Sequence, residues 1–382
     1  MMLDHIGVSL LNTGDLTMEE IVQYAQEAEA LGYEGFWVGE GDGKESFAVL
    51  AAVAAQTRTL SLGTGDVNFY SRTPTLLAMG AATISRLSGG RFRYYGIGTG
   101  GGSWMEAAHG IPLDHPLQRA RETVDILRGI LVSQEDEKAA TAITGLPSDA
   151  VVRGGPTRRF SYQGKMYKLF QFRLREGPLE NPPGIYLSAL GPKMIALAAR
   201  VADGVVSNGL SEASYNRYRA IFEQESQAIG RDPSEIKLFT LTMTTADESG
   251  EALDALRMGL TYFFGAPHFF PVMEASGYGP AVRELCEVWR TEGILAARRL
   301  VTDDMMEQFA VVGSPEQRRR KMRWLLDHGV YPILYPICRQ GHAKEDSFTT
   351  MRSVAQYMKE TAPARSALSS HEEALCLKPE KI

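Results

Sequence analysis

Residues 185–206 read IYLSALGPKMIALAARVADGVV, and this stretch contains the unit that is repeated along the chain. Ile185–Leu190 is apolar and rich in β-formers, which predicts a strand, and Pro192–Val201 has the composition of a helix that begins at a proline. A second strand is predicted at Gly204–Asn208. A strand, a helix and another strand in direct succession are typical of a βαβ unit in a parallel sheet.

The same alternation continues on both sides of this stretch. It predicts eight strands, at His5–Leu11, Gly35–Glu40, Leu60–Val67, Arg91–Gly98, Ile185–Leu190, Gly204–Asn208, Ile236–Thr245 and Val330–Cys338. Helices are predicted between and after them, at Thr17–Leu31, Ser46–Thr57, Pro74–Leu87, Pro192–Val201, Glu212–Ile229, Ser249–Phe263 and Glu345–Lys359. Eight βα units can close without leaving a sheet edge, so we predict an α/β fold, a (β/α)8 TIM barrel, with an open doubly wound sheet as the alternative.

Two segments interrupt the alternation, and both are expected as insertions in one barrel domain that covers residues 1–360. The first, at about 134–183, follows the fourth strand and contains a hairpin-like stretch, Phe160–Lys168, with Gln163 and Gly164 at the turn. The second, at about 267–310, follows the seventh strand and precedes a short helix at Pro315–His328. Its aromatic start, HFFPVMEASGYGP, favours a lid or an interface. Residues 361–382 are polar and predict a C-terminal tail.

The composition excludes several classes of function. Lys and Arg number 40 against 46 Asp and Glu, a net charge of -6, which argues against nucleic-acid binding. The apolar runs are shorter than the roughly 20 residues of a membrane span, and the N-terminus has no basic region typical of a secretory signal. Cys286, Cys338 and Cys376 have no metal-ligand spacing, so we expect no metal site. The sequence predicts a cytoplasmic protein with no nucleic-acid or membrane partner.

Two glycine-containing loops follow neighbouring strands, where the active site of a βα barrel is built. The loop after the fourth strand reads GIGTGGGSW (residues 96–104), and its glycines allow backbone N–H groups to approach phosphate or carbonyl oxygens. The stretch LGPKM (190–194) leads directly into a helix, whose free N–H groups and Lys193 could bind an anion. Each loop taken alone is equally compatible with a plain turn. Together they favour a phosphorylated cofactor.

Polar residues also follow the third strand. Gly65 and Asp66 could permit a bulge or an unusual peptide bond, and Asn68 could hydrogen-bond a planar heterocycle. Asp66 and Asn68 could equally cap the next helix, and Tyr70 could be a solvated loop residue.

Glu40 ends the second strand and is the one carboxylate that the pattern places at the barrel mouth. It is a candidate catalytic group, with a structural pairing to Lys44 or Arg72 as the alternative. His109 and His115 lie in the predicted loop before the fourth helix, and packing is the simplest role for both. Motifs of hydrolase triads and zinc sites are absent.

Four stretches carry a resemblance to a known family: GFWVGEGDG (35–43), LGTGDVNFYSRTPTLLAMGAATISRLSGGRF (62–92), GIGTGGGSW (96–104) and IYLSALGPKMIALAARVADGVV (185–206). Together they resemble the bacterial luciferase-like flavin superfamily. Within it they are most similar to the branch that uses the deazaflavin coenzyme F-420, that of methylenetetrahydromethanopterin reductase. The stretch G-P-K-M followed by A-x-x-A-D-G is the most distinctive part.

The resemblance implies a cofactor, a reaction and a set of binding residues. A cis peptide is expected at Gly65–Asp66, behind the deazaflavin ring, with Asn68 in contact with the ring. The reaction implied is hydride transfer between F-420 and an imine, enone or carbonyl-type small molecule, in a homodimer. Further cofactor contacts are expected at Gly98, Thr99, Gly100, Gly101 and Gly102, and at Leu190, Gly191, Pro192, Lys193 and Met194. Aromatic residues are expected to wall the substrate pocket: Tyr70, Trp104, Phe263, Phe264, Phe269 and Phe270.

The chain departs from relatives in its proton-handling groups. Sugar-phosphate dehydrogenases of this branch have Asp-His where this chain has Glu40 and Gly41, and an acid where it has Gly101. These differences argue against glucose-6-phosphate oxidation and leave Glu40 as the expected proton donor. An FMN-dependent luciferase-like monooxygenase is the alternative, although its Glu-His pair is also missing, and a non-catalytic flavin-binding relative is a third hypothesis.

Overall fold

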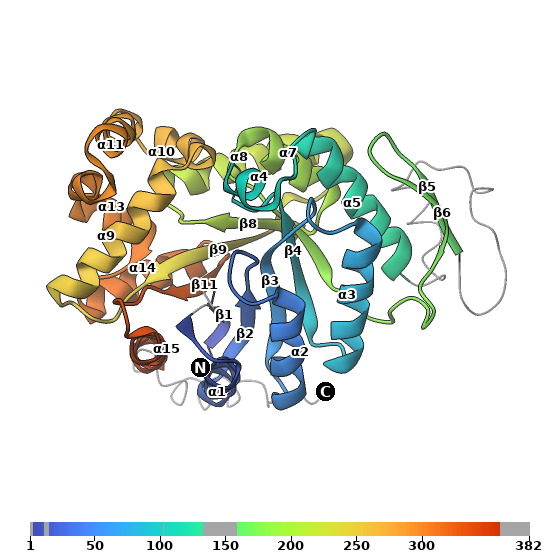
Figure 1. Ribbon diagram of the computed structural model, residues 1–382, viewed down its shortest axis with the longest axis horizontal. Coiled ribbons are helices and arrows are strands. Elements are labelled where there is room, and N and C mark those ends of the chain that lie inside the picture. Colours follow the sequence, from blue (N-terminus) through green and yellow to red (C-terminus); the bar gives the residue numbers. More distant parts are fainter. Residues whose placement is uncertain (1–2, 11–14, 102, 133–158, 360–382) are drawn as a thin grey trace, which may run out of the picture.

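The computed structural model describes residues 3–10, 15–101, 103–132 and 159–359 (Figure 1). Eight parallel strands pair in the order β9, β11, β1, β2, β3, β4, β7, β8, and β8 pairs again with β9, so the sheet closes. The predicted TIM barrel is therefore confirmed, and the open sheet is excluded. The strands are β1 (Leu3–Ser9), β2 (Tyr33–Val38), β3 (Ser61–Asn68), β4 (Phe92–Gly98), β7 (Gly184–Ser188), β8 (Gly204–Asn208), β9 (Lys237–Thr244) and β11 (Val330–Pro336). A two-residue strand, β10 (Ala310–Val311), adds to β9 outside the barrel.

Helices cover the outside of the barrel, and the predicted elements agree with the observed ones to within two residues at each end. The helices are α1 (Met18–Leu31), α2 (Ser46–Gln56), α3 (Pro74–Leu87), α5 (Pro116–Leu131), α7 (Pro192–Val201), α8 (Glu212–Ile229), α9 (Gly250–Gly265), α14 (Pro315–Asp327) and α15 (Ala343–Lys359). The first helix shows why such boundaries are predictable, because Thr17 and Glu20 form a capping box and Gly32 ends the helix in the left-handed conformation. Among the described residues, no helix combines the length and the apolar character needed to cross a membrane.

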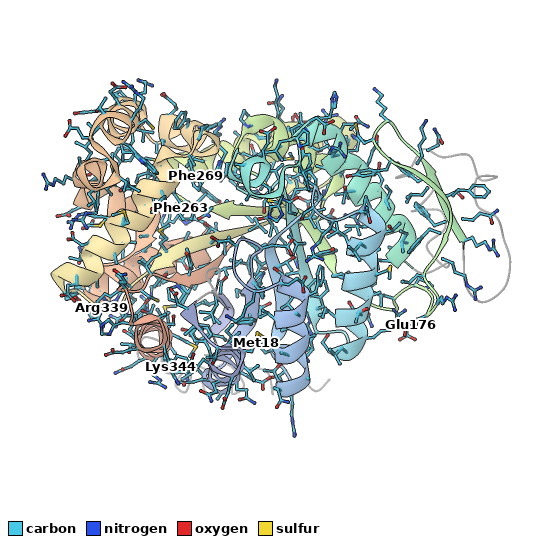
Figure 2. All side chains as sticks on the ribbon, in the orientation of Figure 1. Met18, Glu176, Phe263, Phe269, Arg339 and Lys344 are labelled. Carbon is cyan, nitrogen blue, oxygen red and sulfur yellow. The ribbon has the colours of Figure 1, made fainter. Side chains whose placement is uncertain are left out.

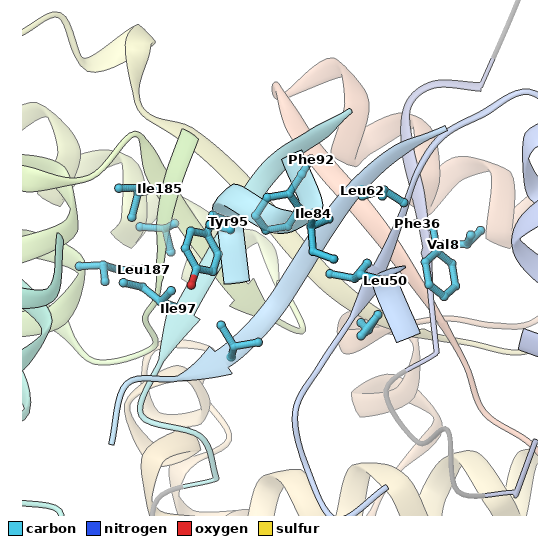
Figure 3. Close-up of a cluster of buried hydrophobic side chains, with 14 of the residues drawn as sticks. Val8, Phe36, Leu50, Leu62, Ile84, Phe92, Tyr95, Ile97, Ile185 and Leu187 are labelled. Carbon is cyan, nitrogen blue, oxygen red and sulfur yellow. The ribbon is translucent and has the colours of Figure 1, made fainter. Parts of the chain in front are cut away.

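The core has two layers. Apolar side chains of the strands pack outward against the helices, as Phe92 and Tyr95 of β4 do beside Ile84 of α3 in Figure 3. Inside the barrel, a second cluster fills the lumen: Trp37, Tyr94, Tyr186, Val206, Phe239, Leu241 and Ile333. Trp37 stacks on Tyr94 with ring centroids 4.9 Å apart. The barrel interior is thus a packed plug of aromatic rings.

The first insertion contains an antiparallel hairpin, β5 (Arg159–Gln163) and β6 (Lys168–Arg173). The sequence located this hairpin but placed its turn wrongly, because the loop spans four residues, 164–167, and β6 begins at Lys168 rather than ending there. The physical reason is Glu122 on α5, whose carboxylate accepts the backbone N–H groups of Lys165, Met166 and Tyr167. This long-range anchor is invisible in the local sequence. Residues 133–158 of this insertion, and the predicted tail, lie outside the described residues.

A second correction concerns the segment after β4. His109 belongs to a short helix, α4 (Ser103–His109), and not to a loop, whereas His115 directly precedes α5 with a positive φ of 48°.

The second insertion is helical throughout. It consists of η5 (Pro267–Phe269), α10 (Phe270–Ala275), α11 (Gly279–Glu292), α12 (Ile294–Ala297), η6 (Arg298–Leu300) and α13 (Asp303–Phe309). These elements share a small core of their own, which also includes Met243 of β9 and Tyr335 of β11. The insertion is therefore packed onto the ends of two barrel strands. In Figure 1 it lies on the opposite side of the barrel from the β5–β6 hairpin.

The aromatic plug generates a stability prediction. A Cβ added at Gly63 would lie 2.6 Å from Cδ1 of Trp37, whose ring is buried and cannot shift. We expect Gly63→Ala to lower the free energy of unfolding by about 1–3 kcal/mol through overpacking. The measurement is urea denaturation, with Gly250→Ala as the control, because a Cβ there meets nothing within 4 Å. Equal stability of Gly63→Ala and wild type would contradict this account of the plug.

Candidate active site

A cavity of about 880 Å³ opens at the carboxyl ends of the barrel strands, above the aromatic plug. Its walls come from the ends of β2, β3, β7, β8, β9 and β11, from the loop after β4, and from α9 with the start of the second insertion. Its size is that of a site for a cofactor or a drug-sized ligand. The cavity thus lies where βα barrels build their active sites, at the carboxyl ends of the strands.

One side of the cavity presents backbone to a ligand. Thr99, Gly100 and Gly101 of the loop after β4 line it, and so does Gly191 at the start of α7. Gly191 has no side chain to cap the helix, and a Cβ there would meet nothing within 4 Å. An uncapped helix N-terminus that faces open space is a favourable position for an anion such as a phosphate.

Glu40 lies in the loop after β2, where it pairs with Arg72. The Nε of Arg72 is 3.1 Å from both carboxylate oxygens of Glu40, and its Nη2 also donates to this carboxylate. Arg72 is itself fixed by Glu45 and by its position 5.1 Å above the ring of Phe47. Glu40 lines the cavity, but its carboxylate forms the ion pair with Arg72 that the sequence allowed as the alternative to a catalytic role.

Asp66 forms part of the cavity floor. The Gly65–Asp66 peptide bond is cis, as predicted. The carboxyl group fills the space over Gly98, because a Cβ at residue 98 would lie 2.7 Å from Cγ of Asp66. Its Oδ2 is buried and accepts no hydrogen bond. Burial raises the pKa of Asp66 to about 6, and the negative charge of Glu40 adds to the rise, although the N–H of Gly100 and the hydroxyl of Ser188 oppose it.

The side-chain amide of Asn68 forms its hydrogen bonds with other residues of the protein. Its Nδ2 donates to the carbonyl of Thr99 at 3.0 Å, and its Oδ1 accepts from the N–H groups of Tyr70 and Ser71. It braces the loops after β3 and β4, and it does not line the cavity. Asn68 therefore has the structural role that the sequence left open as an alternative, and its contact with the ring stays a prediction.

The second insertion and α9 roof the cavity. Phe263 and Phe269 lie close together there (Figure 2), with ring centroids 5.0 Å apart, and both line the cavity with Tyr262, His268 and Pro271. Phe264 points instead into the core of the insertion. The aromatic start of the insertion thus supplies an apolar wall at the barrel mouth, as expected for a lid.

The charged side chains of the cavity are all acidic. Asp15, Glu40, Asp42 and Asp66 line it, and no Lys or Arg does so among the described residues. The start of α7 presents free backbone N–H groups, whereas the loops after β1 and β2 present carboxylates. These two parts of the cavity therefore differ in electrostatic potential.

The predicted site residues divide into three groups. Those that line the cavity are Glu40, Gly65, Asp66, Thr99, Gly100, Gly101, Leu190, Gly191, Met194, Phe263 and Phe269. Those that do not are Asn68, Tyr70, Gly98, Pro192, Lys193, Phe264 and Phe270. Tyr70 is turned away, because its hydroxyl donates to the carbonyl of Asp114 and Arg119 lies over its ring. Gly102 and the side chain of Trp104 lie outside the described residues.

The sequence reasoning missed several lining residues. Ser188 ends β7, Asn208 ends β8, and Tyr335 and Cys338 lie at and just after the end of β11. All four could have been found from the sequence, because active-site residues of βα barrels lie at the carboxyl ends of the strands, and this criterion holds for β7, β8 and β11 as it does for β2 and β3. The described residues contain no group of three or more His, Cys, Asp or Glu that could hold a metal ion.

Comparison with known proteins agrees with this architecture. A family model described as luciferase-like monooxygenase matches residues 2–331. The 5,10-methylenetetrahydromethanopterin reductase of Methanolobus tindarius is 27% identical over 320 residues, which cover 82% of this chain and 89% of that protein. A putative coenzyme F420-dependent oxidoreductase of Mycobacterium tuberculosis is 26% identical over 327 residues, or 83% of this chain and 90% of that protein.

Among solved structures, the coenzyme F420-dependent tetrahydromethanopterin reductase from Methanopyrus kandleri superposes with a TM-score of 0.72 at 23% identity, covering 92% of this chain and 97% of that one. This match shows a shared fold. The family model covers most of the chain, and the motifs that carry the resemblance lie within it. The chain is therefore an enzyme of the luciferase-like monooxygenase family.

Proposed function

We propose that this protein is an F-420-dependent oxidoreductase that transfers a hydride between the deazaflavin and an imine, enone or carbonyl-type small molecule. The observation that carries the proposal is the cavity itself, in which a glycine loop and an uncapped helix start lie beside the floor formed by Gly65 and Asp66. The names of the most similar relatives, which include F420-dependent reductases, support this choice of cofactor.

The residues present fit such a cofactor. A volume of about 880 Å³ accommodates a tricyclic ring together with a small acceptor. The cofactor phosphate would be held at Gly191–Met194, beside the loop at Thr99–Gly101, whose Gly100 N–H already donates to Asp66. The ring would then extend over Gly65 toward Glu40.

When bound, the deazaflavin supplies or accepts a hydride at ring carbon five. The protein's part is to place the acceptor carbon against that atom and to exclude water. Phe263 and Phe269 close the cavity from above, and Val206 and Leu241 of the interior cluster line it from below. Positioning between two rigid surfaces suits a reaction in which the cofactor carries the electrons.

The acidic lining narrows the substrate class. A phosphate or carboxylate substrate would meet Asp15, Glu40, Asp42 and Asp66 without a lining cation. A neutral or cationic acceptor, such as an imine that reacts as its iminium form, fits this surface better. We also propose that the enzyme acts in the cytoplasm as a homodimer, which light scattering after gel filtration tests directly.

An FMN-dependent monooxygenase is the second candidate, because the matching family is described by that activity. Separate titrations of the apo protein with F-420 and with FMN, followed by fluorescence and thermal unfolding, distinguish the two. We expect F-420 to bind more tightly and to raise the melting temperature. Preferential binding of FMN would overturn the cofactor assignment.

Turnover is tested with the reduced deazaflavin. We expect its reoxidation, seen in the return of the oxidised absorbance, when a cyclic imine, a cyclic enone and a ketone are offered in turn. A protein that binds F-420 but reoxidises it with none of many acceptors would instead support the non-catalytic hypothesis.

Lys193 tests the phosphate end of the site. It is exposed at the first turn of α7 and adds positive charge beside the uncapped N-terminus. We expect Lys193→Ala to weaken F-420 binding by about 1–3 kcal/mol, the scale of a charge-assisted hydrogen bond. Lys168→Ala, on the exposed hairpin, is the matched control. Unchanged affinity in the Lys193 variant would remove this side chain from the site.

A further inference from the structure

The active-site cavity contains two neighbouring carboxyl groups whose surroundings differ sharply. The N–H of Glu40 donates to the carbonyl of Asp66 at 2.9 Å, so the two residues are fixed side by side at the ends of β2 and β3. Glu40 receives the guanidinium of Arg72 on both oxygens and the N–H of Asn68 on one. A carboxylate with these partners is fixed in place by charge-assisted hydrogen bonds.

Asp66 has the opposite environment. Its Oδ2 is buried without a hydrogen-bond partner, and its carboxyl group forms no ion pair with the described residues. The charge that acts on it is the negative Glu40. Desolvation and a like charge both favour the neutral acid, and burial raises the pKa of Asp66 to about 6. Gly98 makes this position possible, because any side chain there would collide with the carboxyl group.

We propose that Asp66, and not Glu40, is the residue that holds and delivers the proton in this site, and that Glu40, fixed by Arg72, is the positioning residue that keeps this proton on Asp66. The assignment rests on the proposed function for its chemical step. It moves the proton-donor role from the residue favoured by the sequence to its neighbour on the next strand.

In reduction of a C=O acceptor, the acceptor carbon receives the hydride from the reduced deazaflavin, the π-electron pair moves onto the oxygen, and the oxygen takes the proton from Asp66, which becomes a carboxylate. A C=N acceptor takes the same proton first, on nitrogen, and then receives the hydride as its iminium form. Either order transfers one hydride and one proton. Asp66 then recovers a proton from water through the cavity mouth. In the reverse direction Asp66 is the base.

The other groups that face Asp66 do not supply a compensating charge. Ser188 on β7 and the N–H of Gly100 are neutral donors, and Asn68 is engaged with Thr99. Across the cavity lie further titratable residues: Asp15, Asp42, Tyr262, His268, Tyr335 and Cys338. Burial lowers the pKa of His268 and raises those of Tyr335 and Cys338, so all three are neutral at pH 7.

A first experiment needs neither cofactor nor substrate. The apo protein is labelled with ¹³C at the aspartate carboxyls, and their titration is followed by NMR from pH 3 to 8. We expect one carboxyl that titrates near pH 6 to disappear in Asp66→Asn, and its midpoint to move to lower pH in Glu40→Gln, where the neighbouring charge is lost. An Asp66 carboxyl that titrates below about pH 4.5, close to the ordinary aspartate value, overturns the proposal.

Asp125 provides a matched control. Asp125 lies on α5 and faces Tyr162 of the hairpin, and burial also raises its pKa to about 6, but it lies outside the cavity lining. Asp125→Asn removes a second carboxyl from the same pH range and leaves the Asp66 titration in place.

Stability gives an independent readout on apo protein. A folded-state pKa above the unfolded value means that the native state binds more protons between about pH 4 and pH 6. This contribution to stability is complete below pH 4 and is lost as the pH rises through 6. We therefore expect Asp66→Asn to be more stable than wild type at pH 7.5, and this difference to shrink as the pH falls to 4. A difference that is the same at both pH values contradicts the proposal.

The last readout concerns catalysis, with the reduced deazaflavin and whichever imine, enone or ketone reacts. We expect kcat/KM of wild type to fall as the pH rises through the Asp66 pKa, and Asp66→Asn to lose this dependence with a rate lower by about 10²–10⁴-fold. Asp125→Asn retains the wild-type profile. A pH profile that vanishes in Glu40→Gln but persists in Asp66→Asn assigns the proton to Glu40 instead. If F-420 does not bind wild type, the proposed function fails while the two apo measurements still decide the state of Asp66.

Discussion

Closure of the barrel around its own aromatic core is the constraint on which the rest of the structure depends. The pairing of β8 with β9 completes a ring of eight strands, and a ring of this size leaves a lumen that side chains must fill. Trp37, Tyr94, Tyr186 and Phe239 fill it, and glycines on the neighbouring strands leave space for the Trp37 indole. Without this plug, the strand ends would have no fixed position relative to one another, and the cavity above it would have no floor.

The ends of β2 and β3 also set the electrostatics of the site. The carboxyl group of Asp66 lies over Gly98, and its Oδ2 is buried without a hydrogen-bond partner, so the group is desolvated. Glu40, on the adjacent strand end, is compensated by Arg72. The two acids thus differ in character because one is desolvated and the other pairs with a cation. The start of α7 has no side-chain cap and offers backbone N–H groups instead.

The insertions use the barrel in different ways. The β5–β6 hairpin is attached by the carboxylate of Glu122, far from the cavity, and so contributes to packing on the outer side of α5. The second insertion packs onto the ends of β9 and β11 and brings Phe269 over the cavity. One insertion therefore extends the scaffold, and the other completes the site.

The sequence by itself determined the elements of this fold and the family. Capping residues such as Thr17 and Gly32, and the alternation of apolar strands with helices, act locally, so all eight strands and seven of their helices could be located to within two residues, whereas no bounds were predicted for α5. The family motifs also placed Gly65, Asp66, Gly100 and Gly191 in one site, because parallel strands end at the same edge. Only the tertiary structure decided which partner each side chain takes. Arg72 pairs with Glu40, and Asn68 donates to the carbonyl of Thr99. Glu122 accepts backbone N–H groups of the hairpin turn, and the missing side chain of Gly98 leaves space for Asp66. Such choices depend on distances between residues remote in the chain and on solvent exclusion, which are properties of the closed barrel and not of any single segment.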